Sequence, residues 1–509
     1  MIIPIFASLI LLFLYVFVIK PLCPMIKLKM QFGQDCNMQY NFFGRDIWKR
    51  LRDMKIFNDI FWSDKEEYKK QPYKFKVSNS FWKIQIQVAD PEYYKQMLHN
   101  PHYYEKANNI ADKHLLQKGL IFETRDQWKA QRRILADQFQ YQQLTSRLPM
   151  INKIILDGIT KIGSQNNLFE QLELITGKVV IQSFFGDSMD GLKINNKDLQ
   201  VEVTELINDM GELRFKSKYV FIKRLLLGTW AWNIFPIQEE MKIEQRIFKL
   251  KTMIEKVIRK RLIELRQSST QNDQKSSNIF LDILLNDYIK NDQKKQENQA
   301  IDEVIQQFIT LLFAGTDSTA VLSYHCLYYL SIHPEFQQEV RDEILSICPE
   351  EYIVEDKLKQ LSKLSAFINE VLRLKNPAVN LLMRNSTQTH QVKDLTIQKN
   401  WRVIINFQFQ LLSEKNFKNP NDFDYKRWLS PSPILCNNDF VYLPFSSGQR
   451  NCIGQHMALM EAKIILSQIL KQYYIEPNKE VNPNWNLRFI LQLQPGNCMK
   501  LFKMIEKQD

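Results

Sequence analysis

The sequence predicts a mainly helical protein with a minor β-sheet portion, preceded by a single transmembrane helix at its N-terminus. Three observations predict this fold class. Over most of the chain, apolar residues recur three and four positions apart, which is the spacing of one helix face. Only a few short stretches alternate apolar and polar residues as half-buried strands do. The chain also begins with an uninterrupted apolar run that carries no charge.

The apolar run extends from Ile2 to Ile19, and as a helix it would cover about 27 Å of a hydrocarbon core that is roughly 30 Å thick. A cleaved signal peptide is the alternative, but the run lacks a charged start and a small-residue cleavage site. Lysines follow the run, so the positive-inside rule places the rest of the chain in the cytoplasm. Pro21 and Pro24 are expected to break the helix there.

The chain has 509 residues, which exceeds the roughly 250–300 at which single cores usually stop growing. No long linker divides its body, however. We therefore expect a membrane anchor over residues 1–20, a proline-containing linker over 21–40 and one large folded unit over 41–509.

Several elements of this body can be predicted from periodicity. Long helices are expected over Trp128 to Phe139, Met241 to Leu265, Ile301 to Leu330 and Met457 to Tyr473. Strands are expected over Tyr73 to Val77, Ile84 to Val88, and in a pair formed by Leu395 to Ile397 and Val403 to Ile405. Two polar stretches, Gln267 to Asn278 and Lys290 to Asn298, are typical of exposed loops.

Charge and cysteine content exclude several classes of protein. The formal charge is +12, but the basic residues are scattered, whereas nucleic-acid binding needs a clustered stripe. A diffuse excess fits an anionic membrane surface or an acidic protein partner better. The seven cysteines are odd in number, widely spaced and without a C-x-x-C pair. This pattern excludes a disulfide framework and a zinc site, and it favours a reducing compartment.

The most informative segment reads LPFSSGQRNCIGQH and stands just before a strong helical pattern. Its defined residues are Phe445, Gly448, Arg450, Cys452 and Gly454. A cysteine at a helix N-terminus is favoured as a thiolate, because the unpaired N–H groups and the helix dipole stabilise negative charge. The two glycines would let a flat cofactor approach the backbone, and the arginine can reach an anionic group on the edge of that cofactor. The phenylalanine would cover the sulfur and keep it dry.

This loop resembles the haem-binding loop of the cytochrome P-450 enzymes, whose pattern is F-x-x-G-x-R-x-C-x-G, at every defined position. The resemblance runs from about residue 70 to the carboxyl end and implies the cytochrome P-450 fold. It also implies that the cofactor is haem b (iron protoporphyrin IX), with Cys452 as the axial ligand of the iron. The other six cysteines are expected to be small buried residues. His456 is expected to lie on a helix surface rather than to act as a second ligand.

The stretch from Val304 to Ile332 predicts one long helix that is interrupted at AGTDST, residues 314–319. The glycine and the hydroxyl groups are expected to loosen the helix and open a notch. This segment resembles the family pattern (A/G)-G-x-(D/E)-T-(T/S), which implies that Asp317, Ser318 and Thr319 are catalytic residues that relay protons. Ser318 stands where the family usually has threonine, so the hydroxyl is kept and the methyl is lost. A kinked helix with a satisfied aspartate is the alternative.

Glu370 and Arg373 are three residues apart, on one face of a predicted helix. A surface salt bridge is the common explanation of such a pair. The pair also resembles the E-x-x-R of the family, which implies that Arg427, in the segment FDYKRW, is a third member. Tyr425 stands where proline is usual in that segment. We assign the trio a structural role.

Three further residues are expected to bind the cofactor. Trp128 and Arg132 share a helix face and resemble the W-x-x-x-R with which the family grips a haem propionate. Arg384 resembles another propionate contact. A core tryptophan beside a surface arginine is the alternative for the first two residues.

The resemblance implies a monooxygenase that inserts one oxygen atom from O2 into an apolar organic substrate such as a lipid, sterol or xenobiotic. The implied electron donor is NADPH-cytochrome P-450 reductase, with cytochrome b5 as a second candidate. The anchor favours the endoplasmic reticulum membrane, with a single span and the catalytic domain facing the cytoplasm. Two alternatives stay open, a haem-thiolate isomerase or dehydratase that needs no reductase, and a non-enzymatic membrane-bound haem carrier or sensor.

Substrate specificity is expected in the segments 100–118, 205–235, 304–315, 376–384 and 486–491. The tryptophan-containing stretch from Leu225 to Phe235 is expected to contact the bilayer, and a buried helix–helix contact is the alternative.

Overall fold

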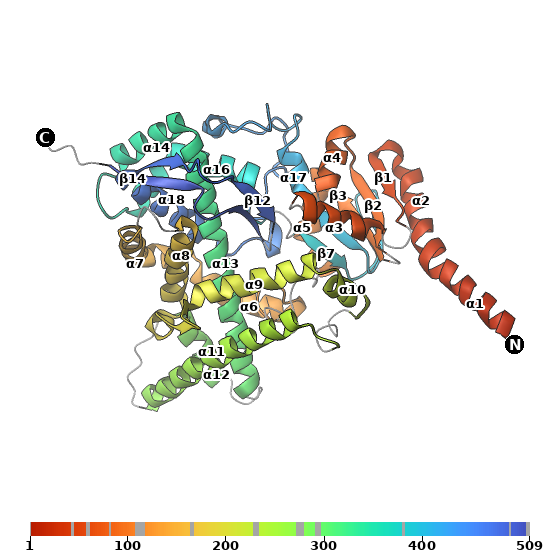
Figure 1. Cartoon of the computed structure of the whole chain (residues 1–509), viewed down its shortest axis with the longest axis horizontal. Coiled ribbons are helices and arrows are strands. Elements are labelled where there is room, and N and C mark those ends of the chain that lie inside the picture. The colour runs from red at the N-terminus through yellow and green to blue at the C-terminus, as the bar shows by residue number, and fades with distance from the viewer. Residues whose placement is uncertain are drawn as a thin grey trace. The chain divides into compact units, whose positions relative to one another are not determined.

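The computed structural model describes residues 2–41, 45–57, 62–80, 83–106, 118–162, 167–227, 234–270, 279–290, 297–378, 382–487 and 490–504 (Figure 1). The chain divides into two compact units. Unit 1 comprises Met1–Ala107, Ala378–Asp424 and Ser430–Cys452, and unit 2 comprises Asn108–Pro377, Tyr425–Leu429 and Ile453–Asp509.

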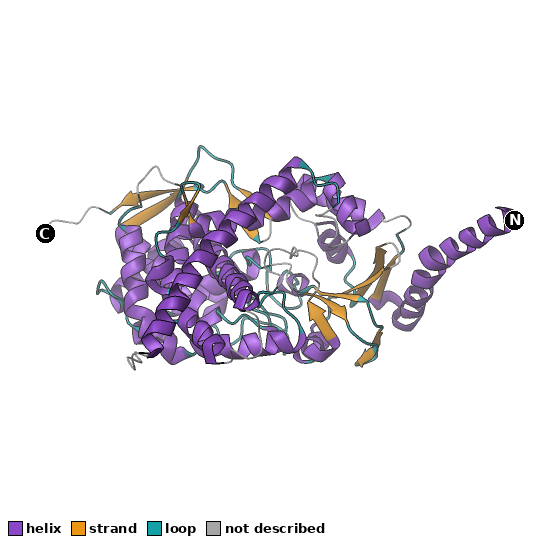
Figure 2. Cartoon of the chain, turned by 90° about the horizontal axis from the view of Figure 1, so that it is seen from below, coloured by secondary structure: helices purple, strands orange, loops and turns teal. Residues whose placement is uncertain are grey.

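Unit 1 is built on a six-stranded sheet, drawn in orange in Figure 2. In spatial order its strands are β1 (Cys36–Gln39), β2 (Phe75–Ser80), β3 (Lys83–Val88), β10 (Arg402–Ile405), β7 (Met383–Ser386) and β4 (Tyr104–Lys106). β1 pairs with β2 and β10 pairs with β3 in parallel, and the other pairs are antiparallel. The helices of this unit beyond the anchor are α3 (Arg45–Phe57), α4 (Trp62–Lys70), α5 (Pro91–His99) and α17 (Phe407–Leu411).

The strands predicted near residues 75 and 86 are confirmed as the antiparallel neighbours β2 and β3. The predicted pairing of Leu395 to Ile397 with Val403 to Ile405 is wrong, although both segments are strands. β9 (Leu395–Ile397) pairs with β8 (His390–Val392), whereas β10 joins the main sheet. Alternation shows that a segment is extended, but the choice of partner depends on contacts that are distant in sequence.

The N-terminal segment is one long helix in three parts: α1 (Ile2–Leu14), a π-helical turn over Tyr15–Ile19, and α2 (Lys20–Phe32). Among the described residues it is the one helix long and apolar enough to cross a membrane. The predicted break at Pro21 and Pro24 is wrong, since α2 continues to Phe32. Pro21 lacks the N–H that would bond to the Phe17 carbonyl in this continuous helix, and the Tyr40 hydroxyl donates to that carbonyl at 2.8 Å instead.

The segment expected as a linker, residues 21–40, forms helix and strand in unit 1. Met25 and Leu28 of α2 are buried. Lys29 Nζ donates to the carbonyl oxygens of Gly33 and Cys36, each at 2.7 Å. These contacts hold the end of the anchor helix at the start of β1.

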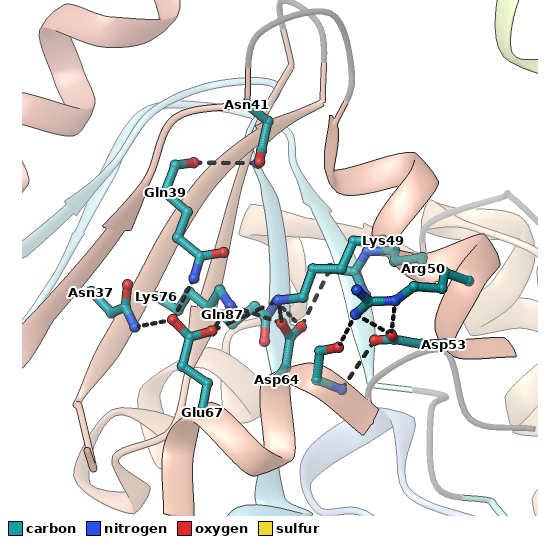
Figure 3. A network of polar contacts seen from close by, with 12 residues as sticks. Asn37, Gln39, Asn41, Lys49, Arg50, Asp53, Asp64, Glu67, Lys76 and Gln87 are labelled. Atoms are coloured by element: carbon teal, nitrogen blue, oxygen red, sulfur yellow. Dashed lines mark hydrogen bonds and ion pairs between the residues drawn. The ribbon is translucent and has the colours of Figure 1, made fainter. Parts of the chain in front are cut away.

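A buried polar network joins α3 and α4 to the first strands of this sheet (Figure 3). Lys76 on β2 is 1% exposed, and its ammonium group lies 2.8 Å from Asp64 Oδ1 on α4. Gln87 Nε2 donates to the other Asp64 oxygen at 2.9 Å, and Lys49 Nζ on α3 donates to Oδ1 at 3.0 Å. Asn37 on β1 donates to Glu67 on α4 at 2.8 Å. The network therefore links β1, the strand that follows the anchor helix, to α4 and β2.

Replacing Asp64 with asparagine is expected to destabilise the protein by about 3 kcal/mol, because buried cations would lose their partner. Burial alone would raise the pKa of the Asp64 carboxyl, but Arg50, Lys76 and Lys49 hold it well below its usual range. A carboxyl group whose pKa is lowered by folding stabilises the folded state. This stabilisation is fully present above the unfolded-state pKa of about 3.9, and it is lost as the pH falls below that value.

The stability difference between wild type and D64N, measured by urea unfolding of the haem-loaded protein, should therefore be constant near neutral pH and shrink below about pH 4. The matched control is E66Q, on the exposed side of the same helix. A pH-independent difference would contradict this account.

Unit 2 is mainly helical. Its helices are α6 (Arg125–Gln138), α7 (Tyr141–Ile159), α8 (Leu168–Phe184), α9 (Leu199–Lys216), α10 (Lys218–Leu227), α11 (Gln238–Thr270), α12 (Phe280–Lys290), α13 (Glu297–Ile332), α14 (Pro334–Ile347), α15 (Glu355–Gln360), α16 (Ser362–Lys375) and α18 (Gln455–Gln472). Its two-stranded antiparallel sheets pair β5 (Lys193–Ile194) with β6 (Lys197–Asp198), β11 (Tyr473–Pro477) with β14 (Met499–Lys503), and β12 (Asn484–Leu487) with β13 (Leu491–Gln494).

The four helices predicted from periodicity are confirmed as α6, α11, α13 and α18, with ends that differ by a few residues. α13 is buried along most of its length and packs against α8, α9, α16 and α18. Of the predicted loops, residues 271–278 and 291–296 lie outside the described part of the chain.

Candidate functional site

The loop that carries Cys452 belongs to unit 1 and is folded back on itself by backbone hydrogen bonds. The N–H of Cys452 donates to the carbonyl oxygen of Phe445 at 2.9 Å, and the N–H of Ser446 donates to Leu443 at 3.1 Å. Ser446 has a φ of 64°, in the left-handed region, so the turn stores backbone strain. The Cys452 side chain is exposed in this loop, as a residue that binds a cofactor must be.

The backbone conformation and the packing of the loop both require glycine at position 448. Its φ is 73°, and a Cβ atom there would lie 2.3 Å from the carbonyl oxygen of Leu98 at the end of α5. A glycine at this position therefore lets the loop pack on α5, and its predicted role of making room for the cofactor stays a prediction. Gly454 is different, because a Cβ atom there would meet Phe139 at an ordinary 3.6 Å.

Three cationic side chains of unit 1 lie near Cys452. Lys106 on β4 and Arg384 on β7 are direct cross-strand partners, so both point to the same face of the sheet. Arg450 comes from the cysteine loop. Burial lowers the pKa of Lys106 well below its usual range, and the charges of Arg384 and Arg450 lower it further, whereas the Cys452 sulfur raises it. Burial also lowers the pKa of Arg384 to about 10.

This arrangement fits a haem. One thiol and three cations lie close together, and the repulsion among the cations would be relieved by an anionic group such as the propionates of a porphyrin. Sequence reasoning found Arg384 and Arg450 but missed Lys106. Lys106 belongs to no motif, and only the register of β4 on β7 brings it beside Arg384.

In unit 2, helix α13 runs without a break through residues 314–319, so the predicted interruption is wrong. The Ser318 hydroxyl donates to the carbonyl oxygen of Ala314 at 2.6 Å, which satisfies a carbonyl of its own helix. Gly315 serves helix packing, because a Cβ atom there would lie 2.7 Å from a methyl group of Val180 on α8. The glycine and the hydroxyl are thus accommodated in a regular helix.

The three predicted proton-relay residues of α13 differ in their surroundings. Ser318 is partly accessible, on the same stripe as Ala314 and Gly315. Asp317 is 1% exposed, and its Oδ1 accepts a hydrogen bond from Gln492 Nε2 of β13 at 3.0 Å. Thr319 is buried. The serine hydroxyl and the aspartate carboxyl therefore leave the helix on different sides.

Glu370, Arg373 and Arg427 meet in unit 2. Glu370 and Arg373 are buried and the Arg427 side chain is 10% exposed, so the surface salt-bridge explanation is excluded. Arg373 Nε and Nη2 each donate to a Glu370 oxygen at 2.9 Å. Arg427 Nε donates to Glu370 Oε1 at 3.0 Å, and Trp428 Nε1 donates to Oε2 at 2.8 Å. Tyr425, the residue in place of the usual proline, donates to Glu339.

Trp128 is buried on α6, and Arg132 lies one turn further along the same helix. Both belong to unit 2, and their role in propionate binding stays a prediction. His456 is exposed on α18, as expected. The expectation for the other six cysteines is only partly correct: Cys36, Cys326, Cys348 and Cys498 are buried, whereas Cys436 is partly buried and Cys23 is exposed on α2.

Parts of the expected specificity segments, residues 107–117, 228–233, 379–381 and 488–489, lie outside the described residues. Most of the stretch that is expected to contact the bilayer, Leu225 to Phe235, also lies outside the described residues. Within that stretch the structure shows Phe235 80% exposed. Lys223, just before it, is buried in an ion pair with Glu240.

The cytochrome P450 family model matches residues 48–501. The chain belongs to the cytochrome P450 family. As a cytochrome P450 it is a haem-thiolate monooxygenase with the mainly helical P450 fold, and its N-terminal apolar helix indicates a membrane anchor.

The alignments of this P450 with curated relatives span most of its chain. Probable cytochrome P450 4d21 of Drosophila melanogaster is 26% identical over 444 residues, which span 82% of this chain and 83% of that protein. Cytochrome P450 3A9 of Rattus norvegicus is 26% identical over 440 residues, 83% of each chain. Secologanin synthase 2 of Catharanthus roseus is 27% identical over 83% of this chain and 79% of its own. The solved structure of retinoic acid-bound cyanobacterial CYP120A1 shares the fold, with a TM-score of 0.71, 19% identity, and coverage of 89% of this chain and 96% of that chain.

Proposed function

We propose that this P450 holds haem b through Cys452 and inserts one oxygen atom from O2 into an apolar substrate, a lipid, sterol or xenobiotic. The observation that carries this proposal is the grouping of the exposed Cys452 thiol with three cations, Lys106, Arg384 and Arg450, in unit 1. A thiolate ligand and an anion-binding edge are the two features that a haem-thiolate site requires.

The haem, when bound, supplies the dioxygen chemistry, and the residues of the chain bind it and move protons. Arg384 and Arg450 would hold propionates, and Trp128 and Arg132 are proposed to hold a propionate from α6. Positive charge beside Cys452 favours its anionic form, which is the form that binds iron. Cys452 is proposed as the only protein ligand of that iron.

Proton delivery is proposed to involve Asp317, Ser318 and Thr319. Ser318 offers the accessible hydroxyl of α13 and can exchange its bond to Ala314 for one to water. Asp317 is the buried acid that can supply the proton through its neighbours. Thr319 is buried, so we propose that it contributes by keeping the helix packed around the acid.

Replacing Ser318 with alanine is expected to uncouple electron use from product formation, with about tenfold less product per NADPH, because one proton-transfer group is lost. Product, NADPH consumed and hydrogen peroxide released are measured together. The control is S323A, one turn along, which loses the same kind of hydroxyl-to-carbonyl bond to Thr319. Equal coupling in S318A and wild type would contradict the assignment.

We also propose that electrons come from NADPH-cytochrome P-450 reductase, with cytochrome b5 as a second donor. The P450 would be a single-pass protein of the endoplasmic reticulum membrane with its catalytic domain in the cytoplasm. The apolar N-terminal helix and the lysines that follow it support this orientation. Apolar substrates partition into such a membrane, so an anchored enzyme meets them at high local concentration.

The test is a screen of lipids, sterols and xenobiotics against the haem-loaded full chain, with binding followed by the spin-state change of the ferric iron. Compounds that bind are then incubated with NADPH and reductase. Oxygenated product that depends on both supports the proposal. Rearranged or dehydrated product without reductase would instead identify an isomerase or dehydratase, and binding without any product would favour a haem carrier or sensor.

A further inference from the structure

Helices α8 and α13 approach each other closely beside Asp317. The Thr176 hydroxyl on α8 donates to the backbone carbonyl of Thr316 on α13 at 3.0 Å. A Cβ atom on Gly177 would lie 3.3 Å from the Thr316 hydroxyl oxygen. Glu173 lies one turn before Thr176 and Gly177, on the same stripe of α8. The stripe therefore directs the Glu173 carboxyl toward α13 near Asp317.

Helix α9 also packs against α8 near the Glu173 carboxyl group. A Cβ atom on Gly177 would lie 2.5 Å from the side chain of Gln200, so α8 and α9 are also in close contact. One turn before Gly177 on α8 and one turn after Gln200 on α9, Glu173 has a hydrogen bond with the Thr204 hydroxyl. Glu173 is 7% exposed and Asp317 is 1% exposed. Two carboxyl groups thus share a place from which water is largely excluded.

Two neighbouring carboxyl groups in such a place cannot both ionise easily. Burial, and then the charge of Asp317, raise the pKa of Glu173 to about 8. The other charged groups that act on Glu173 are also acidic: Glu205 on α9 and Glu170 on α8 itself. Near neutral pH the pair therefore carries one proton and one negative charge.

We propose that Glu173 is a positioning residue that supplies protons to Asp317 from the side of α8 and α9. In this step the O–H bond of the Glu173 carboxyl breaks, an O–H bond forms on Asp317, and the negative charge passes to Glu173. Glu173 then takes a proton from water. The side chain of Glu205, 41% exposed, marks the side from which water can approach. The inference rests on the proposed role of Asp317.

The protonation state is tested by infrared spectroscopy of the haem-loaded full chain, labelled with ¹³C-glutamate. At pH 7 the wild type should show the C=O band of a protonated glutamic acid that is lost in E173Q and kept in E335Q, a control at an exposed glutamate of α14. Glu461 on α18 is also buried, and burial raises its pKa well above the usual range, so it contributes a band in all variants. Identical spectra for wild type and E173Q would overturn the proposal.

The proton supply is tested with NADPH, reductase and oxygen, without added substrate. Oxygen consumption by the wild type should fall as the pH rises through about 8, because Glu173 then loses its proton. E173Q should consume oxygen about tenfold more slowly, with a larger solvent deuterium isotope effect and without this pH step. E173D should restore both the rate and the step, which a merely structural role would not require.

D317N separates the two proposals. If D317N is slow and E173Q matches the wild type in rate and pH profile, the supply role of Glu173 is wrong and the role of Asp317 stands. If D317N matches the wild type, the role of Asp317 fails, and the inference fails with it.

Discussion

Replacing Cys452 with alanine is expected to abolish the haem-thiolate absorbance of the reduced, carbon monoxide-treated protein, together with all reductase-driven turnover. The Cys452 thiolate is the one proposed protein ligand of the iron, and a thiolate ligand is what would give the bound haem its dioxygen chemistry, so we expect no other residue to substitute for it. The measurement is the carbon monoxide difference spectrum at a known haem content.

C436A is the matched control for this variant. Cys436 lies in the same unit, and its thiol donates to Asn416 Oδ1 at 3.1 Å. C436A should keep the wild-type spectrum. A C452A variant that still turned over, or a wild-type protein whose haem is held by nitrogen, would remove the assignment of the ligand.

Replacing Glu370 with alanine is expected to cost about 3–5 kcal/mol of folding free energy, because two arginines would be left without their carboxylate partner. That is a large share of the roughly 5–15 kcal/mol by which native proteins are stable. Glu370 and Arg373 are completely buried, and Trp428 would also lose its hydrogen-bond acceptor. We expect a steep loss of soluble, haem-loaded protein and a lower unfolding midpoint in urea.

The control for this variant is E335A on α14, whose carboxylate is 57% exposed and lies 3.4 Å from His333 Nδ1. It should unfold within about 0.5 kcal/mol of the wild type, as surface substitutions usually do. If E370A were as stable as E335A, the buried trio would contribute little, and its structural role would have to be abandoned.

The E-x-x-R pair shows how far sequence reasoning reaches. Spacing alone places Glu370 and Arg373 on one helix face, where a surface salt bridge is the common outcome. The family resemblance added Arg427 as a partner, from a segment more than fifty residues away. The complete burial of Glu370 and Arg373, and the hydrogen bond from Trp428, depend on the packing of α16 against the Tyr425–Leu429 turn, which the sequence pattern does not reveal.

The sequence by itself determined the features that are local. The apolar N-terminal helix, the helical class of the body and the cysteine loop each depend on residues close together in the chain, where period and residue chemistry carry the information. The cysteine loop was decisive because five residue types at fixed offsets rarely coincide.

Only the tertiary structure decided which distant residues meet. The register of β4 on β7 brings Lys106 beside Arg384, and the close packing of α8 on α13 brings Glu173 to Asp317. The anchor helix also continues past two prolines that local rules treat as breakers, and Tyr40 donates to the Phe17 carbonyl that Pro21 leaves without a helical partner. Burial and pKa depend on such neighbours, and the free energy of a distant contact leaves no periodic trace in the sequence.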